Sequence, residues 1–349
     1  MTSVFNLFPA IADEVECEAA RVRYLAQSPQ RRVREAKYSI GMHQRRDAQM
    51  ETGEHTSELG QWQTVQRTAD PRLRAHVHGY FASSSNLRMP VQERHLPSAE
   101  VPLLLNFGEP HRRADAAGSG EWTTRDGAWI VGLHTRHQLT QAAGERHFMV
   151  VRFTPIGAHL FLGLPMDAIA NEAIDLEQID SAFARELTGR IGFARGWTER
   201  FDAMESLIAQ RIGNVEVLAD VALAWRRLVA ADGRVALGSL ARELNCSHRT
   251  LIAKFRTCVG FTPKTVARLL RFSRVVRCLD RASGTRANEI VGKPYIESVH
   301  AGDRLVGAIR WADIAADCGY FDQAHLINDF RAFAGSTPDA FLRCMSDVV

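Results

Sequence analysis

A segment near the C-terminus places polar side chains at helical spacing opposite two apolar residues. Leu251 and Phe255 lie four apart within residues 248–259, so they share one face of a predicted helix. At about 100° per residue, the opposite face carries Arg249, Thr250, Ala253 and Arg256. Guanidinium, hydroxyl and methyl groups can contact base edges or phosphates in a nucleic-acid groove. We predict base contacts for the first three and a phosphate contact for Arg256.

A second segment, residues 323–334, repeats this arrangement. Leu326 and Phe330 take the apolar positions, and the outward face is mostly polar. A residue near the start of such a helix reaches base edges most easily. The predicted base contacts are Gln323, Ala324, His325 and Asn328, and the predicted phosphate contact is Arg331.

Each of these helices follows another short helix and a tight turn. Two short helices joined in this way form a helix-turn-helix unit, predicted here at 237–260 and 311–335. Glycine at the second turn accepts a positive φ, and Ser and Asp are preferred N-caps. In the first unit the inward face is Leu240, Ala241 and Leu244, the turn is Asn245-Cys246, and the N-cap is Ser247. In the second unit the inward face is Ile314, Ala315 and Cys318, the turn residue is Gly319, and the N-cap is Asp322.

Residues 263–280 are predicted to form a helix that links the two units. Pro263 suits the first turn of a helix. About 18 residues at ~1.5 Å each span ~27 Å, near the ~34 Å repeat of a DNA duplex. Thr262, Lys264 and Arg271 are predicted phosphate contacts. The arginines of the helix form a basic face that neutralises phosphates or, as the alternative, is only solvated: Arg268, Arg271, Arg274 and Arg277.

The charge distribution agrees with these assignments. The formal net charge is only +3, but residues 234–281 hold eleven Lys or Arg and two acidic residues. Such a cluster is typical of a nucleic-acid contact, and on charge alone a basic solvated helix face is an equal alternative. The composition, 46% hydrophobic and 24% charged, excludes a disordered chain. Because no apolar run approaches the roughly 18 residues needed to span a bilayer, we expect a cytoplasmic, nucleoid-associated protein without membrane contact.

The duplicated unit resembles the AraC/XylS family of bacterial transcription regulators. The resemblance lies in Ala312-Asp313-Ile314-Ala315, Cys318-Gly319-Tyr320, Asp322-Gln323-Ala324-His325-Leu326, Phe330-Arg331 and Gly335-Ser336-Thr337-Pro338. It implies a DNA-binding domain at 233–349 whose two units occupy successive major grooves. The chain departs from the family in an insertion at 282–310 and in Ala253, where the family often has a long polar residue.

The N-terminal part has a different pattern. Short apolar runs between turn residues, among them the separate runs 138–142 and 147–153 on either side of Gly144, predict a β-rich, barrel-like domain at 57–178. A helical spacer or dimerisation segment is predicted at 179–232. Residues 1–56 are predicted to be a poorly ordered extension. The β-rich segment resembles the sensor-like domain of some AraC-type regulators, in Asn106-Phe107-Gly108-Glu109-Pro110 and Val151-Arg152-Phe153-Thr154-Pro155 among other motifs. The predicted fold class is α+β, with an all-α C-terminal domain.

Enzymatic alternatives have weaker support. His76 with His78, and His134 with His137, suggest a cupin-like metalloenzyme, but no matching Glu and His complete a ligand set. Cys17 suggests a DNA-repair methyl acceptor, yet the zinc-binding cysteines of such a site are missing. No GxSxG, phosphate-binding or dinucleotide motif occurs. We therefore expect no catalytic activity, metal or cofactor.

The expected function is sequence-specific regulation of transcription, controlled by a small molecule or a partner through the N-terminal domain. The expected partners are double-stranded DNA, a small-molecule effector, RNA polymerase and a second copy of the chain. The effector, the promoter and the direction of regulation do not follow from the sequence.

Overall fold

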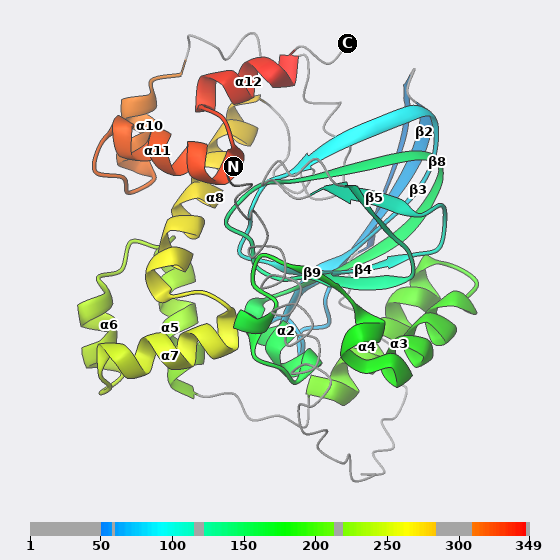
Figure 1. The fold of residues 1–349 in the computed structure, drawn as a ribbon, viewed down its shortest axis with the longest axis horizontal. Coiled ribbons are helices and arrows are strands. Elements are labelled where there is room, and N and C mark those ends of the chain that lie inside the picture. The colour runs from blue at the N-terminus through cyan, green and yellow to red at the C-terminus, as the bar shows by residue number, and fades with distance from the viewer. Residues whose placement is uncertain (1–49, 58–59, 115–121, 213–218, 284–308, 347–349) are drawn as a thin grey trace, which may run out of the picture.

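A computed structural model describes residues 50–57, 60–114, 122–212, 219–283 and 309–346. The predicted extension up to residue 49 and most of the predicted insertion at 282–310 lie outside the described residues. The remainder forms a curved antiparallel sheet followed by helices (Figure 1). The predicted α+β class, with a β-rich part ahead of an all-α part, is confirmed.

The sheet has nine strands, in the order β1-β2-β3-β8-β4-β7-β9, with β5 and β6 off this path. Its centre is the long pair β3 (Val77–His95) and β8 (Gln138–Phe153). These two strands present buried Tyr80, Met149 and Val151 to the core. The other strands are β1 (Met50–Ser57), β2 (Gly60–Thr68), β4 (Val101–Asn106), β5 (His111–Ala114), β6 (Trp122–Arg125), β7 (Ala128–Val131) and β9 (Ala173–Asp175).

Two features of the sheet differ from the sequence prediction. Strand β1 begins at Met50, whereas the predicted β-rich domain begins at residue 57. The apolar runs on either side of Gly144, predicted as separate pieces, form the single strand β8. Gly144 has a φ of 67° and faces Leu87, where the β3–β8 register shifts. The glycine is therefore part of a β-bulge-like irregularity and does not reverse the chain.

Three helices pack against the sheet. They are α2 (Pro155–Leu162), α3 (Leu176–Gly192) and α4 (Trp197–Ile212), with the short 3-10 helix η1 (Met166–Ala168) after α2. Helix α2 is apolar on nearly every side, which suits its burial. Its Phe161 ring lies 4.8 Å from the Phe153 ring, and Phe201 of α4 lies 5.6 Å from Tyr80. These contacts join the helices to the core of the sheet.

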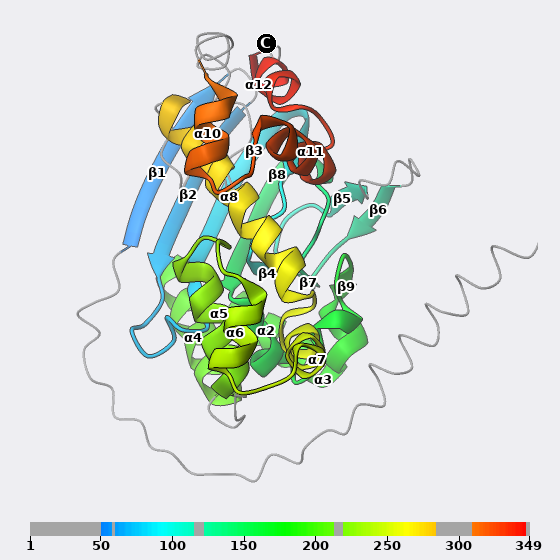
Figure 2. The ribbon, with the colours of Figure 1, turned by 90° about the vertical axis from the view of Figure 1, so that its left-hand side faces the viewer.

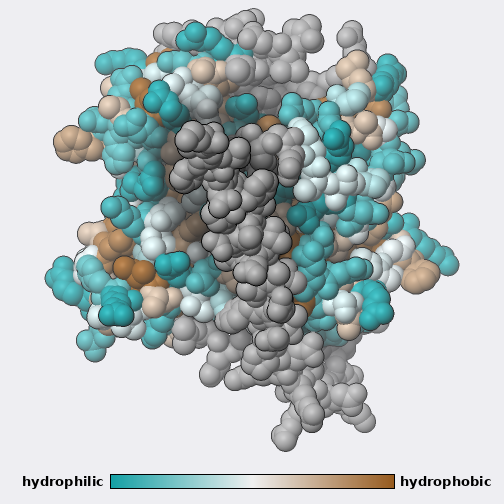
Figure 3. Space-filling view, viewed as in Figure 1, coloured by the Kyte–Doolittle hydropathy of each residue, from teal (hydrophilic) through white to brown (hydrophobic). Residues whose placement is uncertain are grey.

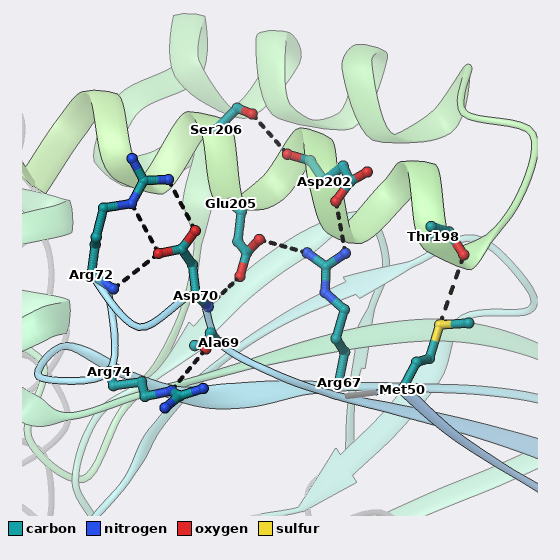
Figure 4. Close-up of polar contacts among 10 residues, drawn as sticks. All are labelled: Met50, Arg67, Ala69, Asp70, Arg72, Arg74, Thr198, Asp202, Glu205 and Ser206. Atoms are coloured by element: carbon teal, nitrogen blue, oxygen red, sulfur yellow. Dashed lines mark hydrogen bonds and ion pairs between the residues drawn. The ribbon is translucent and has the colours of Figure 1, made fainter. Parts of the chain in front are cut away.

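A buried ion pair fixes α4 against β2 (Figure 4). Arg67 donates from Nη1 to Asp202 and from Nη2 to Glu205, both at 2.8 Å. The other carboxylate oxygen of Glu205 accepts the Asp70 N–H at 2.8 Å. Arg67 and Glu205 are both buried, and the guanidinium also lies 5.4 Å from the centre of the Tyr80 ring. A buried pair with these hydrogen bonds is costly to break from one side.

The C-terminal helices form two units joined by α8 (Pro263–Ser283), which runs between them in Figure 2. The first half of α8 packs its Val266 and Leu270 with the first unit, and the second half packs Phe272 and Val275 with the second. The linker helix predicted at 263–280 is thus confirmed and extends to Ser283. The other helices are α5 (Ala219–Ala230), α6 (Leu237–Glu243), α7 (His248–Val259), α10 (Trp311–Asp317), α11 (Gln323–Ala334) and α12 (Pro338–Ser346).

None of the helices in the described part of the chain is both long and apolar enough to cross a bilayer.

Candidate nucleic-acid interface

Helices α6 and α7 form the first predicted helix-turn-helix unit. Leu240 and Ala241 of α6 are buried with Leu251 and Phe255 of α7. The turn contains Asn245 with a φ of 48°, a conformation that asparagine tolerates better than most residues. At the start of α7, Ser247 Oγ accepts the Thr250 N–H at 3.1 Å, so the predicted N-cap is confirmed.

Helix α5, in the predicted spacer, supports this unit. The Trp225 ring lies 6.5 Å from Phe255, and Lys254 pairs with Asp220 at 2.7 Å. The hydrogen bond from Lys254 lowers the pKa of Asp220. The last helix of the spacer therefore belongs structurally to the first unit, and dimerisation through 179–232 stays a prediction.

The outward face of α7 agrees with the face predicted from its sequence. All four predicted contact residues on this helix are exposed. No side chain in the described part of the molecule pairs with Arg249 or Arg256, so both guanidinium groups face solvent. The Thr250 hydroxyl, in contrast, already has a hydrogen-bond partner, because it lies 2.8 Å from Ser247 Oγ. Ala253 presents only a methyl group.

Helices α10 and α11 form the second unit on the same plan. Ala315 and Cys318 are buried with Leu326 and Phe330. Gly319 has a φ of 78° in the turn, as the sequence predicts. Asp322 caps α11 by accepting the His325 N–H at 2.7 Å.

The outward face of α11 carries the second predicted set. Gln323, Ala324, Asn328 and Arg331 are exposed, and the described residues offer no side-chain partner to Gln323, Asn328 or Arg331. His325 is half-buried: its ring meets Tyr320 edge-on at 5.2 Å, and Nε2 lies 4.0 Å from the Asp329 carboxylate. Hydrophilic residues predominate over α10 to α12 at the upper left of Figure 3.

Three arginines of the linker helix form ion pairs with aspartates elsewhere in the protein. Arg268 donates to buried Asp329 of α11, at 2.7 Å from Nη2, and so fixes α11 to α8. Arg274 and Arg277 both pair with Asp232, at 2.6 and 2.8 Å. The alternative reading of this basic face as merely solvated is therefore incomplete, because these side chains hold the units in place.

The three predicted phosphate contacts around the linker differ in their surroundings. Lys264 is exposed and has no partner among the described side chains. Thr262 is half-buried and its Oγ1 accepts the Thr265 N–H at 3.2 Å. Arg271 donates to the Gly233 carbonyl at 3.3 Å and lies over the Tyr320 ring. A phosphate would have to compete with these partners for Arg271.

Sequence reasoning missed the two aspartates that receive the linker arginines. Asp329 lies between Leu326 and Phe330 on the inward face of α11, and a charged residue among buried ones implies a partner. That signal was present in the sequence. Asp232 gave no such signal, because it acts from a turn with a φ of 47°.

The β-rich domain contacts the C-terminal ends of both α7 and α11. After α7, a Cβ on Gly260 would lie 3.1 Å from the Met166 carbonyl of η1. After α11, the His137 N–H donates to the Phe333 carbonyl at 2.8 Å, and a Cβ on Gly335 would collide with the His137 ring. In Figure 1 both helices run toward the sheet from the left, so their N-terminal ends point away from it.

The β-rich domain contains buried histidines next to buried arginines. Arg113 donates to His134 Nε2 at 3.1 Å, and His134 Nδ1 donates to the Gly132 carbonyl. Burial and the neighbouring Arg113 lower the pKa of His134 to about 3, and burial with Arg146 lowers that of His111 to about 4. Both imidazoles are therefore neutral near pH 7.

Histidines that the sequence suggests as metal ligands contact other protein groups in the structure. His78, from the other predicted pair, lies 2.9 Å from Glu100. Across the described residues, no three His, Cys, Asp or Glu side chains are grouped in a way that could hold a metal ion.

Comparisons with known proteins give a family match for the β-rich domain. Residues 66–175 match the model of a family described as a domain of unknown function, DUF6597. No curated protein sequence matches the chain.

Solved structures provide distant likenesses. ToxT from Vibrio cholerae O395 is 12% identical, with a TM-score of 0.38 over 75% of this chain and 98% of that chain. The AraC-like transcriptional activator CuxR is 11% identical, with a TM-score of 0.31 over 70% of this chain and 90% of that chain. A single-residue variant of oxalate decarboxylase from B. subtilis is 16% identical, with a TM-score of 0.21 over 30% of this chain and 27% of that chain.

Proposed function

We propose that this chain is a sequence-specific DNA-binding regulator of transcription of the AraC/XylS type, controlled through its N-terminal domain. One observation carries the proposal: two helix-turn-helix units present outward faces whose long polar side chains have no partner among the described residues. Four arginines of the neighbouring linker helix have internal partners, namely Arg268, Arg271, Arg274 and Arg277. Among the described arginine side chains of α7, α8 and α11, the ones without a partner, Arg249, Arg256 and Arg331, therefore lie on the two helices that would enter a major groove.

The residue types suggest what each face contacts. Arg249 can donate two hydrogen bonds to a guanine edge, and Gln323 or Asn328 can pair with an adenine edge. Contacts of His325 with a base, and of Thr250, Ala253 and Ala324 with base edges or methyl groups, complete the proposed set. The proposed phosphate contacts are Arg256, Thr262, Lys264 and Arg331, with Arg271 free to join only if it leaves Gly233.

Effector control is supported by a small cavity next to the second unit. Its volume is about 80 Å³, and its walls come from residues 95–102 and 131–138. Leu96, in the first wall, packs against the core of the second unit. His137, between two residues of the second wall, donates to the Phe333 carbonyl. A molecule bound here would lie beside the segments that contain Leu96 and His137, which both contact the second unit, so we infer that its binding shifts α11 relative to the β-rich domain.

The proposal is tested by selecting bound sequences from random double-stranded DNA and then measuring affinity by gel shift. Arg249→Ala should cost ~1–3 kcal/mol and relax specificity at one base pair. Gln323→Ala should do the same at a position read by the second unit. Arg195→Ala is the matched control, since Arg195 is exposed in the turn between α3 and α4. Figure 1 shows these two helices away from both units. Failure to select any sequence, or equal losses in all three variants, would reject the assigned interface.

Contact with RNA polymerase, dimerisation, a bacterial source and a nucleoid location stay predictions that accompany this proposal.

A further inference from the structure

The two helix-turn-helix units differ by one residue in the turn. Four residues separate α6 from α7, and five separate α10 from α11. In the first unit a single residue, Cys246, lies between the positive-φ residue and the N-cap. In the second unit, Tyr320 and Phe321 occupy that interval. Tyr320 is buried in the core, whereas Phe321 is 93% exposed.

The backbone around Phe321 is well anchored although its ring is not. Before it, the Tyr320 N–H donates to the Ala315 carbonyl at 2.8 Å. After it, Asp322 accepts the His325 N–H and begins α11. Anchors on both sides fix the position at which the ring leaves the protein. The second unit thus exposes the Phe321 ring to solvent just before the N-terminus of α11. Burial of this ring against a partner would be favourable.

The surroundings favour DNA over a protein as the partner of this ring. Protein interfaces typically bury about 800 Å² on each side around a central apolar cluster. Among the described large hydrophobic residues that are exposed, Phe321 is the one that belongs to the second unit. Its neighbours on α11 are polar or small, namely Gln323, Ala324 and Asn328. In the major groove, the C5-methyl group of thymine is the apolar feature that a phenylalanine can contact.

We propose that Phe321 contacts the C5-methyl group of a thymine in the major groove and thereby helps the second unit choose its sequence. The inference rests on the proposed DNA-binding function and adds a contact that the polar face of α11 does not supply. It makes thymine, in preference to the other bases, the expected base opposite the start of α11.

Deoxyuridine provides a direct test, because it keeps the base pairing of thymine and lacks only the methyl group. Each thymine of the selected site is replaced in turn, and affinities are measured for the intact protein, Phe321→Ala and Phe193→Ala. Phe193 is the matched control, since it is 91% exposed in the turn between α3 and α4. One replacement should weaken binding of the intact protein and of Phe193→Ala by roughly fourfold, the ratio for burying one methyl group. The same replacement should leave Phe321→Ala unaffected.

Other outcomes overturn the inference. Equal sensitivity of Phe321→Ala and the intact protein at every thymine would mean that the ring does not contact a methyl group. Unchanged DNA affinity of Phe321→Ala would place the ring off the DNA and leave a protein partner as its role. Absence of sequence-selective binding by the intact protein would reject the proposed function itself. Circular dichroism of Phe321→Ala should match that of the intact protein, because the ring contributes little to the core.

Discussion

Substitution of Gly335 by alanine tests the contact between the β-rich domain and the second recognition helix. Gly335 ends α11 with a φ of 78°, a left-handed conformation that costs an alanine roughly 1–2 kcal/mol. The added methyl group would also collide with the His137 ring. Displacement of His137 would break the hydrogen bond from its backbone N–H to the Phe333 carbonyl. Such a hydrogen bond contributes about 0.5–1.5 kcal/mol net to stability. The expected total is about 1.5–3.5 kcal/mol of unfolding free energy.

Gly163 provides a matched control for backbone strain alone. It ends α2 with a φ of 70°, and an added Cβ would meet nothing within 4 Å. Gly163→Ala should therefore cost only the roughly 1–2 kcal/mol of strain. In the double variant His137→Ala/Gly335→Ala the collision is removed, so its cost should be less than the sum of the two single costs.

The assay is urea unfolding followed by circular dichroism, with the midpoint and slope fitted for each variant. Equal costs for Gly335→Ala and Gly163→Ala, together with strict additivity in the double variant, would refute the reasoning. That result would mean that His137 does not pack on the end of α11, and the proposed route from the cavity to the DNA-reading helix would be lost.

Three further predictions concern stability, DNA binding and pH. Arg67→Met should destabilise the protein by ~3–5 kcal/mol in urea unfolding, because it leaves the Glu205 carboxylate buried without its cation; Arg67→Met/Glu205→Leu should recover much of that loss. Arg256→Ala and Lys264→Ala should each reduce the slope of log affinity against log salt concentration by about one, equally for specific and random DNA. His134 has its pKa lowered to about 3, so the unfolded chain binds more protons below pH 6.5, and stability should fall as the pH decreases from about 6.5 toward 3. His134→Gln should flatten that dependence in urea midpoints measured against pH.

Much of the C-terminal domain could be predicted from the sequence because its information is local. The apolar pairs Leu251/Phe255 and Leu326/Phe330 fix the buried faces of α7 and α11, and Ser247 and Asp322 fix where these helices begin. Helical periodicity then determines which side chains point outward. The predicted contact residues consequently lie on the expected faces, while their contacts with DNA stay predictions.

Features that depend on distant residues could not be derived in this way. The pairing of Arg274 and Arg277 with Asp232 joins positions more than 40 residues apart. The sequence shows a basic helix face, and only the fold shows which arginines are already engaged. Likewise, the apolar runs around Gly144 read as two strands, because the bulge in β3 that makes them continuous lies elsewhere in the chain.

Sequence patterns also do not predict that the β-rich domain contacts the ends of α7 and α11. The spacing of His137 from His134 suggests a pair of metal ligands. In the structure its backbone and ring instead meet the end of α11, at Phe333 and Gly335. Spacing along a strand or loop indicates which residues share a face, but it does not indicate what the face meets.

The most direct test of the central claim is the ratio of affinities of the intact protein for its selected DNA sequence and for a scrambled sequence of the same composition. Both are measured by fluorescence anisotropy at one fixed salt concentration near the physiological value. Two units that read base edges predict a ratio of about 10³ or more in favour of the selected sequence. A ratio near one would show that the basic segment only attracts nucleic acid without reading it, and would contradict the assignment of α7 and α11 as recognition helices.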